Sequence, residues 1–235
     1  QDFNETILGE SEEYYMNLIA DAMEPYLAAS GIQFTRNTPD MTAASSIAAS
    51  NAGNYDLHLA LHSNAVGSGQ QSTVRGIDAY YYPASVNGKR FADIAANNLQ
   101  LIYPLPGMVK TVPTTRLGEV ARVRAPGVLI ELGYHDNPLD ADWIRNNINN
   151  IAENLVLSLT EYFGIPFNMP QPIQVGYVST EGSNLNIRSR PDIGAPIIGK
   201  IPNGSEIVIY NRLPEWDLAG YGGVMGYVSS RYVAV

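Results

Sequence analysis

The chain contains three histidines, and one of them, His62, has the sequence surroundings of a catalytic or metal-binding residue. It ends the apolar run DLHLALH at 56–62 and opens the polar sequence HSNA. Its side chain is therefore expected at the carboxyl end of a buried strand, where open α/β sheets bind ligands, although a hydrogen-bonded strand-end histidine is the alternative. His58 lies four residues earlier, about 13 Å away in a strand, so the two cannot share one metal and His58 is interpreted as structural.

Carboxylates are the second group of candidates. Glu131 lies in APGVLIELGYHDNP, among apolar neighbours that strongly penalise an ionised carboxylate without a partner. A nearby metal or a catalytic proton would explain such a residue, and an ion pair with an arginine is the alternative. Glu12 and Glu13 open an expected helix, where the helix dipole favours acidic side chains, so capping is their default role.

Composition narrows the possible chemistry. Without cysteine the chain has no thiol nucleophile or cysteine zinc site, so a metal would need histidine and carboxylate ligands. The net charge of −9, with 18 of the 23 acidic residues in 1–166, disfavours nucleic acid as a partner. No apolar run approaches the roughly 18 residues of a membrane span, and the first residues lack signal-peptide features, so any export signal is expected to have been removed.

Helical and strand periodicities alternate over residues 1–166. Helices are predicted at 12–29, with a kink or early break at Pro25, and at 42–52, 88–102 and 140–163. Strands are predicted at 32–36, 56–62, 76–82 and 127–132. This alternation indicates an α/β domain with a mostly parallel sheet flanked by helices.

Proline then interrupts the pattern, because IPFNMPQP carries three prolines within eight residues. We place a linker at 167–174. Beyond it, short strand-like runs alternate with Gly, Pro, Asn and Asp, which predicts a small all-β barrel over 175–235.

The motifs in the first part occur in a recognisable order. SEEYYMNLIADAM, YDLHLALHSNA, GIDAYYY and APGVLIELGYHDNP together resemble the zinc-dependent N-acetylmuramoyl-L-alanine amidases called amidase 3, over about residues 1–166. The resemblance implies Glu13 and His62 as zinc ligands and Glu131 as the catalytic residue, with Glu12 the nearest competitor of Glu13. The family's Gly-His-Gly turn, which supplies another zinc-binding histidine, is absent here. His135 could substitute for it, although an exposed loop histidine is the favoured interpretation.

The reaction that the resemblance implies is hydrolysis of the amide between muramic acid and L-alanine in peptidoglycan. Zn²⁺ would acidify a bound water, and Glu131 would take its proton and then protonate the departing amine. Asn64 is expected to orient the substrate or hold its loop. Arg122 and Arg124 are expected to pair with stem-peptide carboxylates, with solvation or ion pairs to Glu119 as the alternative.

The C-terminal segments LNIRSRPDIGAPIIGKIPNG and GYVSSRYV, with Trp216 between them, resemble the bacterial SH3 domain. Such a module implies binding to the cell wall, and a secreted or wall-associated protein. Two alternatives remain open. One is a metal-free wall-binding protein with an amidase-like scaffold, and the other is a zinc carboxypeptidase or endopeptidase that cuts stem peptides.

Overall fold

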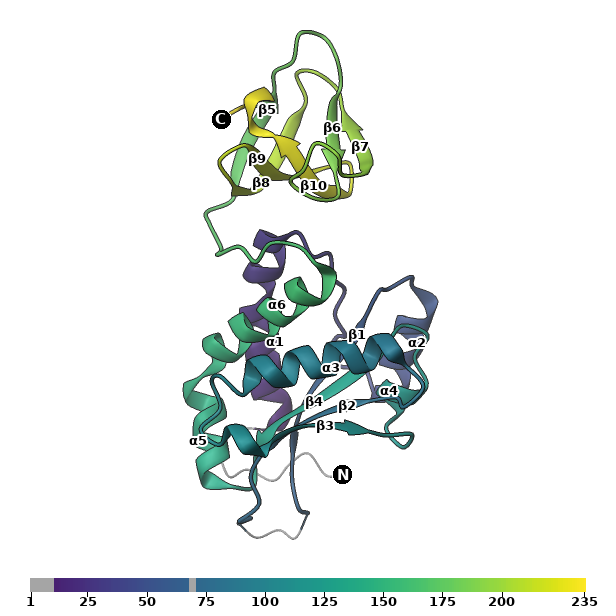
Figure 1. Ribbon diagram of the computed structural model, residues 1–235, viewed down its shortest axis with the longest axis vertical. Coiled ribbons are helices and arrows are strands. Elements are labelled where there is room, and N and C mark those ends of the chain that lie inside the picture. The colour runs from purple at the N-terminus through teal and green to yellow at the C-terminus, as the bar shows by residue number, and fades with distance from the viewer. Residues whose placement is uncertain (1–10, 68–70) are drawn as a thin grey trace. The chain divides into compact units, whose positions relative to one another are not determined.

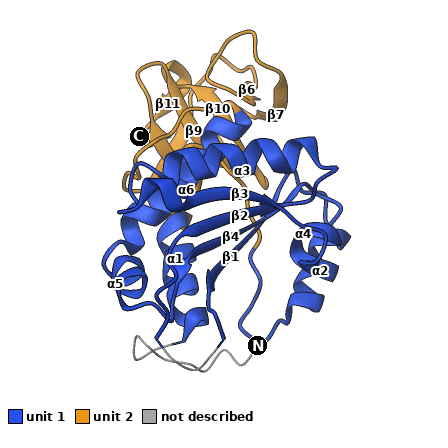
Figure 2. Ribbon diagram, turned by 60° about the horizontal axis from the view of Figure 1, so that its bottom comes forward, with its two compact units in different colours: residues 1–23, 36–163 blue, residues 24–35, 164–235 orange. Residues whose placement is uncertain are grey.

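The computed structural model describes residues 11–67 and 71–235, and the chain divides into two compact units. Unit 1 takes in residues 1–23 and 36–163, and unit 2 takes in 24–35 and 164–235 (Figure 2). The end of the first helix thus belongs to unit 2, although the sequence pattern assigned it to the first domain. Within the described ranges, none of the helices is long and apolar enough to cross a membrane.

The first helix, α1 (Glu12–Ser30), follows the predicted range but continues through Pro25, where a break was predicted. Its buried face extends on both sides of the proline, with Met23 before it and Leu27 after it. This burial offsets the hydrogen bond that proline removes. The second helix, α2 (Ala43–Ala52), begins with a capping box between Thr42 and Ser45.

The remaining elements of unit 1 form one sheet and its covering helices. The strands are β1 (His58–Asn64), β2 (Ile77–Tyr81), β3 (Val109–Pro113) and β4 (Gly127–Tyr134). The helices are α3 (Val86–Leu99), η1 (Pro106–Met108), α4 (Gly118–Ala121), α5 (Pro138–Asn146) and α6 (Ile148–Phe163). The strand order is β1-β4-β2-β3, in which β1 pairs parallel with β4, β2 pairs parallel with β3, and β2 pairs antiparallel with β4. The predicted α/β class with a largely parallel sheet is confirmed.

The two faces of the sheet have different roles. On one face, Ala79 of β2 and Ile130 of β4 are paired and fully buried, and α3 packs against these strands with α6 next to it (Figure 1). On the other face, Ala60, Val120 and Leu129 form a smaller cluster that joins β1 and β4 to α4. Because side chains alternate along a strand, His62 and Glu131 belong to this second face.

Two predicted elements differ from the structure. The predicted helix 140–163 is two helices, because Asn147 leaves the helical conformation (φ −127°, ψ 21°) and its side chain donates to the Trp143 carbonyl at 2.8 Å. The predicted strand 32–36 forms no sheet pairing with the other described residues, and Gln33, Phe34 and Thr35 are exposed. Strand β3 and helix α4 were not predicted.

Unit 2 contains a seven-stranded antiparallel sheet, which confirms the predicted all-β region. Its strand order is β11-β5-β8-β9-β10-β6-β7. The strands are β5 (Gln174–Val178), β6 (Leu185–Arg188), β7 (Ile197–Ile201), β8 (Glu206–Arg212), β9 (Trp216–Tyr221), β10 (Val224–Ser229) and β11 (Val233–Ala234), with η2 (Ser230–Tyr232) before the last. Aliphatic side chains such as Ile187, Ile207 and Val228 fill the core.

Candidate active site

His62 and Glu131 lie opposite each other in the register of the parallel strands β1 and β4. Paired residues of neighbouring strands point to the same face, so both side chains lie on the face that α4 covers. The sequence placed both residues at strand ends but gave no sign of their pairing. The sheet therefore brings together two of the three predicted catalytic and metal-binding residues.

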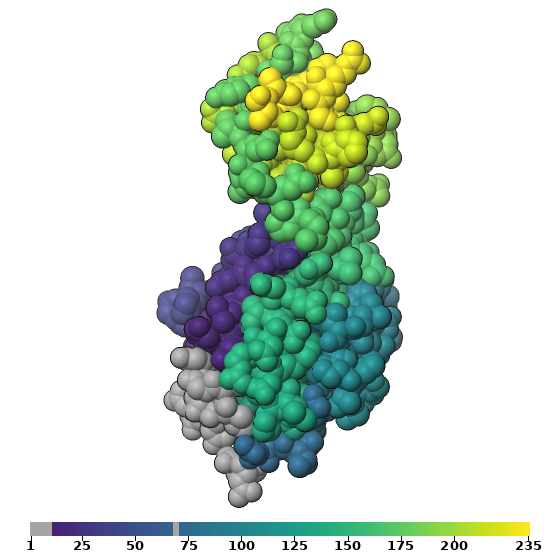
Figure 3. Space-filling view, turned by 90° about the vertical axis from the view of Figure 1, so that its left-hand side faces the viewer, coloured from purple at the N-terminus to yellow at the C-terminus, as the bar shows by residue number. Residues whose placement is uncertain are grey.

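Glu12, and not Glu13, is the carboxylate of α1 that reaches His62. Glu12 Oε1 lies 3.2 Å from His62 Nδ1 and accepts the backbone N–H of Ser63 at 2.8 Å. Glu13 is exposed. Figure 3 shows the N-terminal part of α1, in purple, at the surface beside the green atoms of α5 and α6.

The helical period explains why Glu12, and not Glu13, faces His62. Glu12 precedes the buried residues Met16, Ile19 and Met23 by four, seven and eleven positions, so it continues the inward face of α1. Glu13 is rotated by about 100° from that face, toward solvent. The structure therefore places Glu12, which the sequence analysis named as the competitor of Glu13, beside His62.

His62 lies between two carboxylates. Its Nε2 is 3.2 Å from Glu119 Oε2, on the side of the ring opposite Glu12. Burial lowers the pKa of His62, but hydrogen bonds to Glu119 and Glu12 outweigh burial and raise the pKa to about 10. Burial raises the pKa of Glu119, but the contacts with His58 at 3.9 Å and His62 at 3.2 Å outweigh burial and bring the pKa down to about 2. Sequence reasoning missed Glu119 as part of the site.

Glu131 is the unusual acid of the site. Its Oε2 is buried and has no hydrogen-bond partner among the described residues. Burial is the main cause that raises the pKa of Glu131 to about 7, and the charges of Glu12 and Asp78 add to it while His62 opposes it. Asp78 faces Glu131 across the antiparallel pairing of β2 and β4. A carboxyl group with this pKa changes its protonation near neutral pH.

The donor atoms of Glu12 and His62 fit two ligands of one zinc ion. Tetrahedral zinc with bonds of 2.0–2.1 Å separates neighbouring ligand atoms by about 3.3 Å, close to the observed 3.2 Å between Nδ1 and Oε1. The described residues include no group of three metal-binding side chains. His135, considered as a substitute ligand, makes other contacts: its Nδ1 lies 2.9 Å from Ser63 Oγ and 3.0 Å from the Ser63 carbonyl oxygen.

The predicted substrate-binding residues hold loops. Asn64 Oδ1 accepts the backbone N–H of the next residue, Ala65, at 2.9 Å. Arg124 Nη1 donates to the Asn51 carbonyl at 3.0 Å, and the Arg122 carbonyl accepts from Asn51 Nδ2 at 2.8 Å. These contacts tie the segment before β4 to the end of α2.

Comparison with known proteins agrees with this geometry. Residues 2–161 match the model of the N-acetylmuramoyl-L-alanine amidase family, which is more than half of the chain. The chain belongs to this family. The predicted family and the predicted peptidoglycan amidase function are therefore confirmed. No curated protein matches this amidase sequence.

Solved structures show that the amidase fold is shared. An N-acetylmuramoyl-L-alanine amidase from Clostridium difficile 630 is 18% identical with a TM-score of 0.59, over 67% of this chain and 86% of that one. Ami1 from Mycobacterium smegmatis is 17% identical with a TM-score of 0.60, over 70% and 82%. AmiC2 from Nostoc punctiforme is 20% identical with a TM-score of 0.57, over 67% and 87%.

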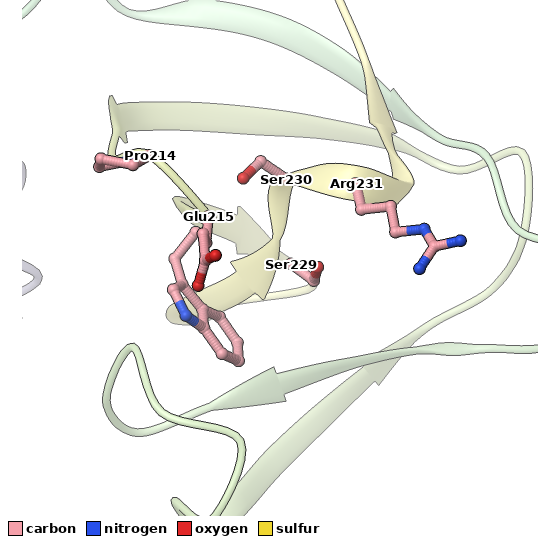
Figure 4. A pocket seen from close by; sticks show the side chains of 6 residues that line it. Pro214, Glu215, Ser229, Ser230 and Arg231 are labelled. Carbon is pink, nitrogen blue, oxygen red and sulfur yellow. The ribbon is translucent and has the colours of Figure 1, made fainter.

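The second unit of the amidase carries a bacterial SH3 domain, matched over residues 183–234. An open hollow of about 480 Å³ lies in this unit. Its lining residues are Pro214, Glu215, Trp216, Ser229, Ser230 and Arg231. Ser230 Oγ is buried without a partner among the described residues, and Figure 4 shows the Arg231 guanidinium pointing away from Glu215. The hollow thus offers separate acidic and basic groups.

Proposed function

We propose that this amidase hydrolyses the amide between N-acetylmuramic acid and the L-alanine of the stem peptide, with Glu131 as general base and then general acid. One observation carries the proposal. A buried carboxylate oxygen of Glu131, without a hydrogen-bond partner among the described residues, lies on the sheet face where His62 and Glu12 meet. A buried acid of this kind is typical of a site that moves protons.

Glu131 is suited to both proton transfers. A catalytic group works best when its pKa is near the working pH, and burial raises the pKa of Glu131 to about 7. Its carboxylate takes a proton from the attacking water. The same carboxyl group then gives the proton to the departing amine of L-alanine.

Glu12 and His62 would hold the zinc ion on which the family generally depends. Bound zinc polarises a scissile carbonyl and lowers the pKa of water. The Ser63 N–H fixes the orientation of the Glu12 carboxylate, so this ligand is held in place before metal binds. Metal binding must displace the proton on His62 Nδ1, because a ligating nitrogen needs its lone pair.

The SH3 unit would bind the same wall in which the amidase cuts. Its hollow contains Trp216, Glu215 and Arg231, which suit a ligand with apolar, amino and carboxylate groups such as a wall peptide. Asn64 and Arg122 stay proposed contacts to the stem peptide. A protein with these roles acts outside the cell membrane, as secreted or wall-associated.

A metal-free wall-binding protein is the second candidate function. The observation that favours it is the placement of carboxylates at both ring nitrogens of His62, which favours a fully protonated imidazole. A protonated ring cannot bind metal. Zinc content separates the two functions.

The test is digestion of purified peptidoglycan by the full chain with zinc supplied, alongside Glu131→Gln. We expect the parent to release stem peptides with a free L-alanine amine, seen by mass spectrometry, and to retain zinc after gel filtration. Cleavage at another amide would identify a carboxypeptidase or endopeptidase. An intact wall and no retained zinc would reject the proposal in favour of a binding protein.

A further inference from the structure

Glu119 connects two histidines that the sequence left unrelated. Its Oε2 lies 3.2 Å from His62 Nε2, and its Oε1 lies 3.9 Å from His58 Nε2. The Glu119 side chain is only 16% exposed. His58 and His62 are four residues apart on β1, so they share one face, and a single carboxylate spans them.

The position of Glu119 is set independently of the histidines. Glu119 belongs to the single turn α4, and its neighbour Val120 is buried against Ala60 and Leu129 of the sheet. The backbone bond from Ala121 N–H to the Leu117 carbonyl, at 2.9 Å, closes the turn. The carboxylate is therefore presented to His62 by a packed backbone and not by a mobile loop.

The carboxylate beside His62 Nε2 determines which ring nitrogen keeps its proton. An ionised carboxylate only accepts hydrogen bonds, so the Nε2 that faces Glu119 must carry a proton. The other nitrogen, Nδ1, faces Glu12 Oε1 at 3.2 Å and by the same argument also carries a proton while no metal is bound. When that proton leaves, the Nε2 proton stays with Glu119, so the lone pair of the neutral ring lies on Nδ1. A carboxylate that accepts a hydrogen bond from the non-ligating nitrogen of a histidine fixes the orientation of the ring and strengthens metal binding.

We propose that Glu119 is a positioning residue that holds the His62 ring through Nε2, so that Nδ1 is the nitrogen that faces Glu12 and is left to bind a metal ion. His58 Nε2 lies 3.9 Å from the other Glu119 oxygen, and Ser50 Oγ, 3.0 Å from His58 Nδ1, fixes the His58 ring. The inference rests on the proposed function for the identity of the metal, but the hydrogen bond itself can be tested without metal.

The test uses Glu119→Leu, which removes the acceptor, and Glu119→Gln, which keeps an amide oxygen but no charge. Glu161→Gln on α6, an exposed position, is the matched control. Zinc affinity is measured by competition with a chromophoric chelator. We expect a 10- to 100-fold loss for Glu119→Leu, an intermediate loss for Glu119→Gln and none for the control. In hydrolysis at limiting zinc we expect kcat to fall and KM to stay unchanged, as for a residue that acts through His62.

A second readout uses nitrogen-15 histidine spectra of the metal-free protein, in which only three histidines contribute. The parent should show a hydrogen-bonded Nε2 proton on His62 that Glu119→Leu loses. If folded Glu119→Leu keeps both the parent zinc affinity and this proton signal, the inference is wrong. If the parent binds no zinc and cleaves nothing, the proposed function fails, and the proton signal alone decides the role of Glu119.

Discussion

The pairing of His62 with Glu131 across β1 and β4 is the relationship on which the site depends. Neighbouring strands lie about 4.8 Å apart, so the sheet itself fixes the spacing of the two residues. A loop would not hold a buried acid as firmly beside an imidazole. The chemistry therefore depends on the sheet register, and changes at Glu131 should affect both activity and stability.

The first prediction concerns Glu131→Gln and the pH dependence of stability. Since the folded-state pKa of Glu131 is about 7 and its ordinary value is 4.5, the folded protein keeps a proton that the unfolded chain loses between these values. Parent stability therefore falls as pH rises from about 4.5 through about 7, by about 3 kcal/mol at most. Glutamine does not titrate, so the variant should gain stability over the parent at pH 8 and not at pH 4.

Urea unfolding of both proteins with a chelator present measures this difference. Glu161→Gln, at an exposed position on α6, is the control. The difference between its free energy of unfolding and that of the parent should be the same at pH 4 and at pH 8. Activity should change in the opposite direction, with kcat of Glu131→Gln lower by about 10²- to 10⁴-fold. If the stability difference between Glu131→Gln and the parent is the same at pH 4 and pH 8, the pKa of Glu131 is not raised by burial.

The second prediction distinguishes the two acids that open α1. Glu12→Gln should weaken zinc binding by at least 10-fold, because it removes a charged ligand beside His62 Nδ1. Glu13→Gln should bind zinc as the parent does, since Glu13 is exposed. Metal content after dialysis measures both. Loss of zinc in Glu13→Gln alone would restore the assignment made from the motif.

How much of this site the sequence predicts can be judged from these two glutamates. The motif spacing selected Glu13, whereas the helical period from Met16 and Ile19 points to Glu12. The helical period can be read from the sequence, so the position of Glu12 on the inward face of α1 could have been predicted. Glu131, the proposed catalytic residue, was singled out because burial of an acid is visible locally, as a carboxylate among apolar residues.

Other parts of the site had no local signal. Glu119 lies on a helix of four residues, too short for a periodic pattern, and it reaches His62 only because α4 packs on the sheet. The break at Asn147 also escaped prediction, because a continuous apolar stripe does not show a side chain that bonds to a backbone carbonyl. Strand pairing and side-chain bonds of this kind depend on tertiary contacts.

The third prediction concerns Asp140, a fully buried acid outside the active site. Its carboxylate accepts from Arg75 Nε at 2.7 Å, from the Tyr103 hydroxyl at 2.6 Å, and from the backbone N–H groups of Gly76 and Tyr134, both at 3.1 Å. Asp140→Ala leaves these donors without their acceptor and should cost about 3–5 kcal/mol in denaturant unfolding.

The matched control for Asp140 is the surface pair of Lys89 and Asp93, whose side chains are 53% and 39% exposed. Asp93→Ala should leave the unfolding midpoint unchanged, because exposed ion pairs contribute little. Equal effects of the two substitutions would mean that the Asp140 network does not hold the ends of β2 and β4 in place.

The fourth prediction tests the hollow of the SH3 unit. Arg231 lines the hollow and is exposed, so its guanidinium is available to a peptide carboxylate. Arg231→Ala should weaken binding to insoluble cell wall by about tenfold, the loss expected when a charged hydrogen bond is removed. Arg190→Ala removes an exposed arginine of the same unit that does not line the hollow, so it should bind like the parent. Co-sedimentation with the wall in high and low salt measures both variants. Equal weakening of the two would mean that binding follows the charge of the unit and not the hollow, and the proposed wall contact would move elsewhere on the domain.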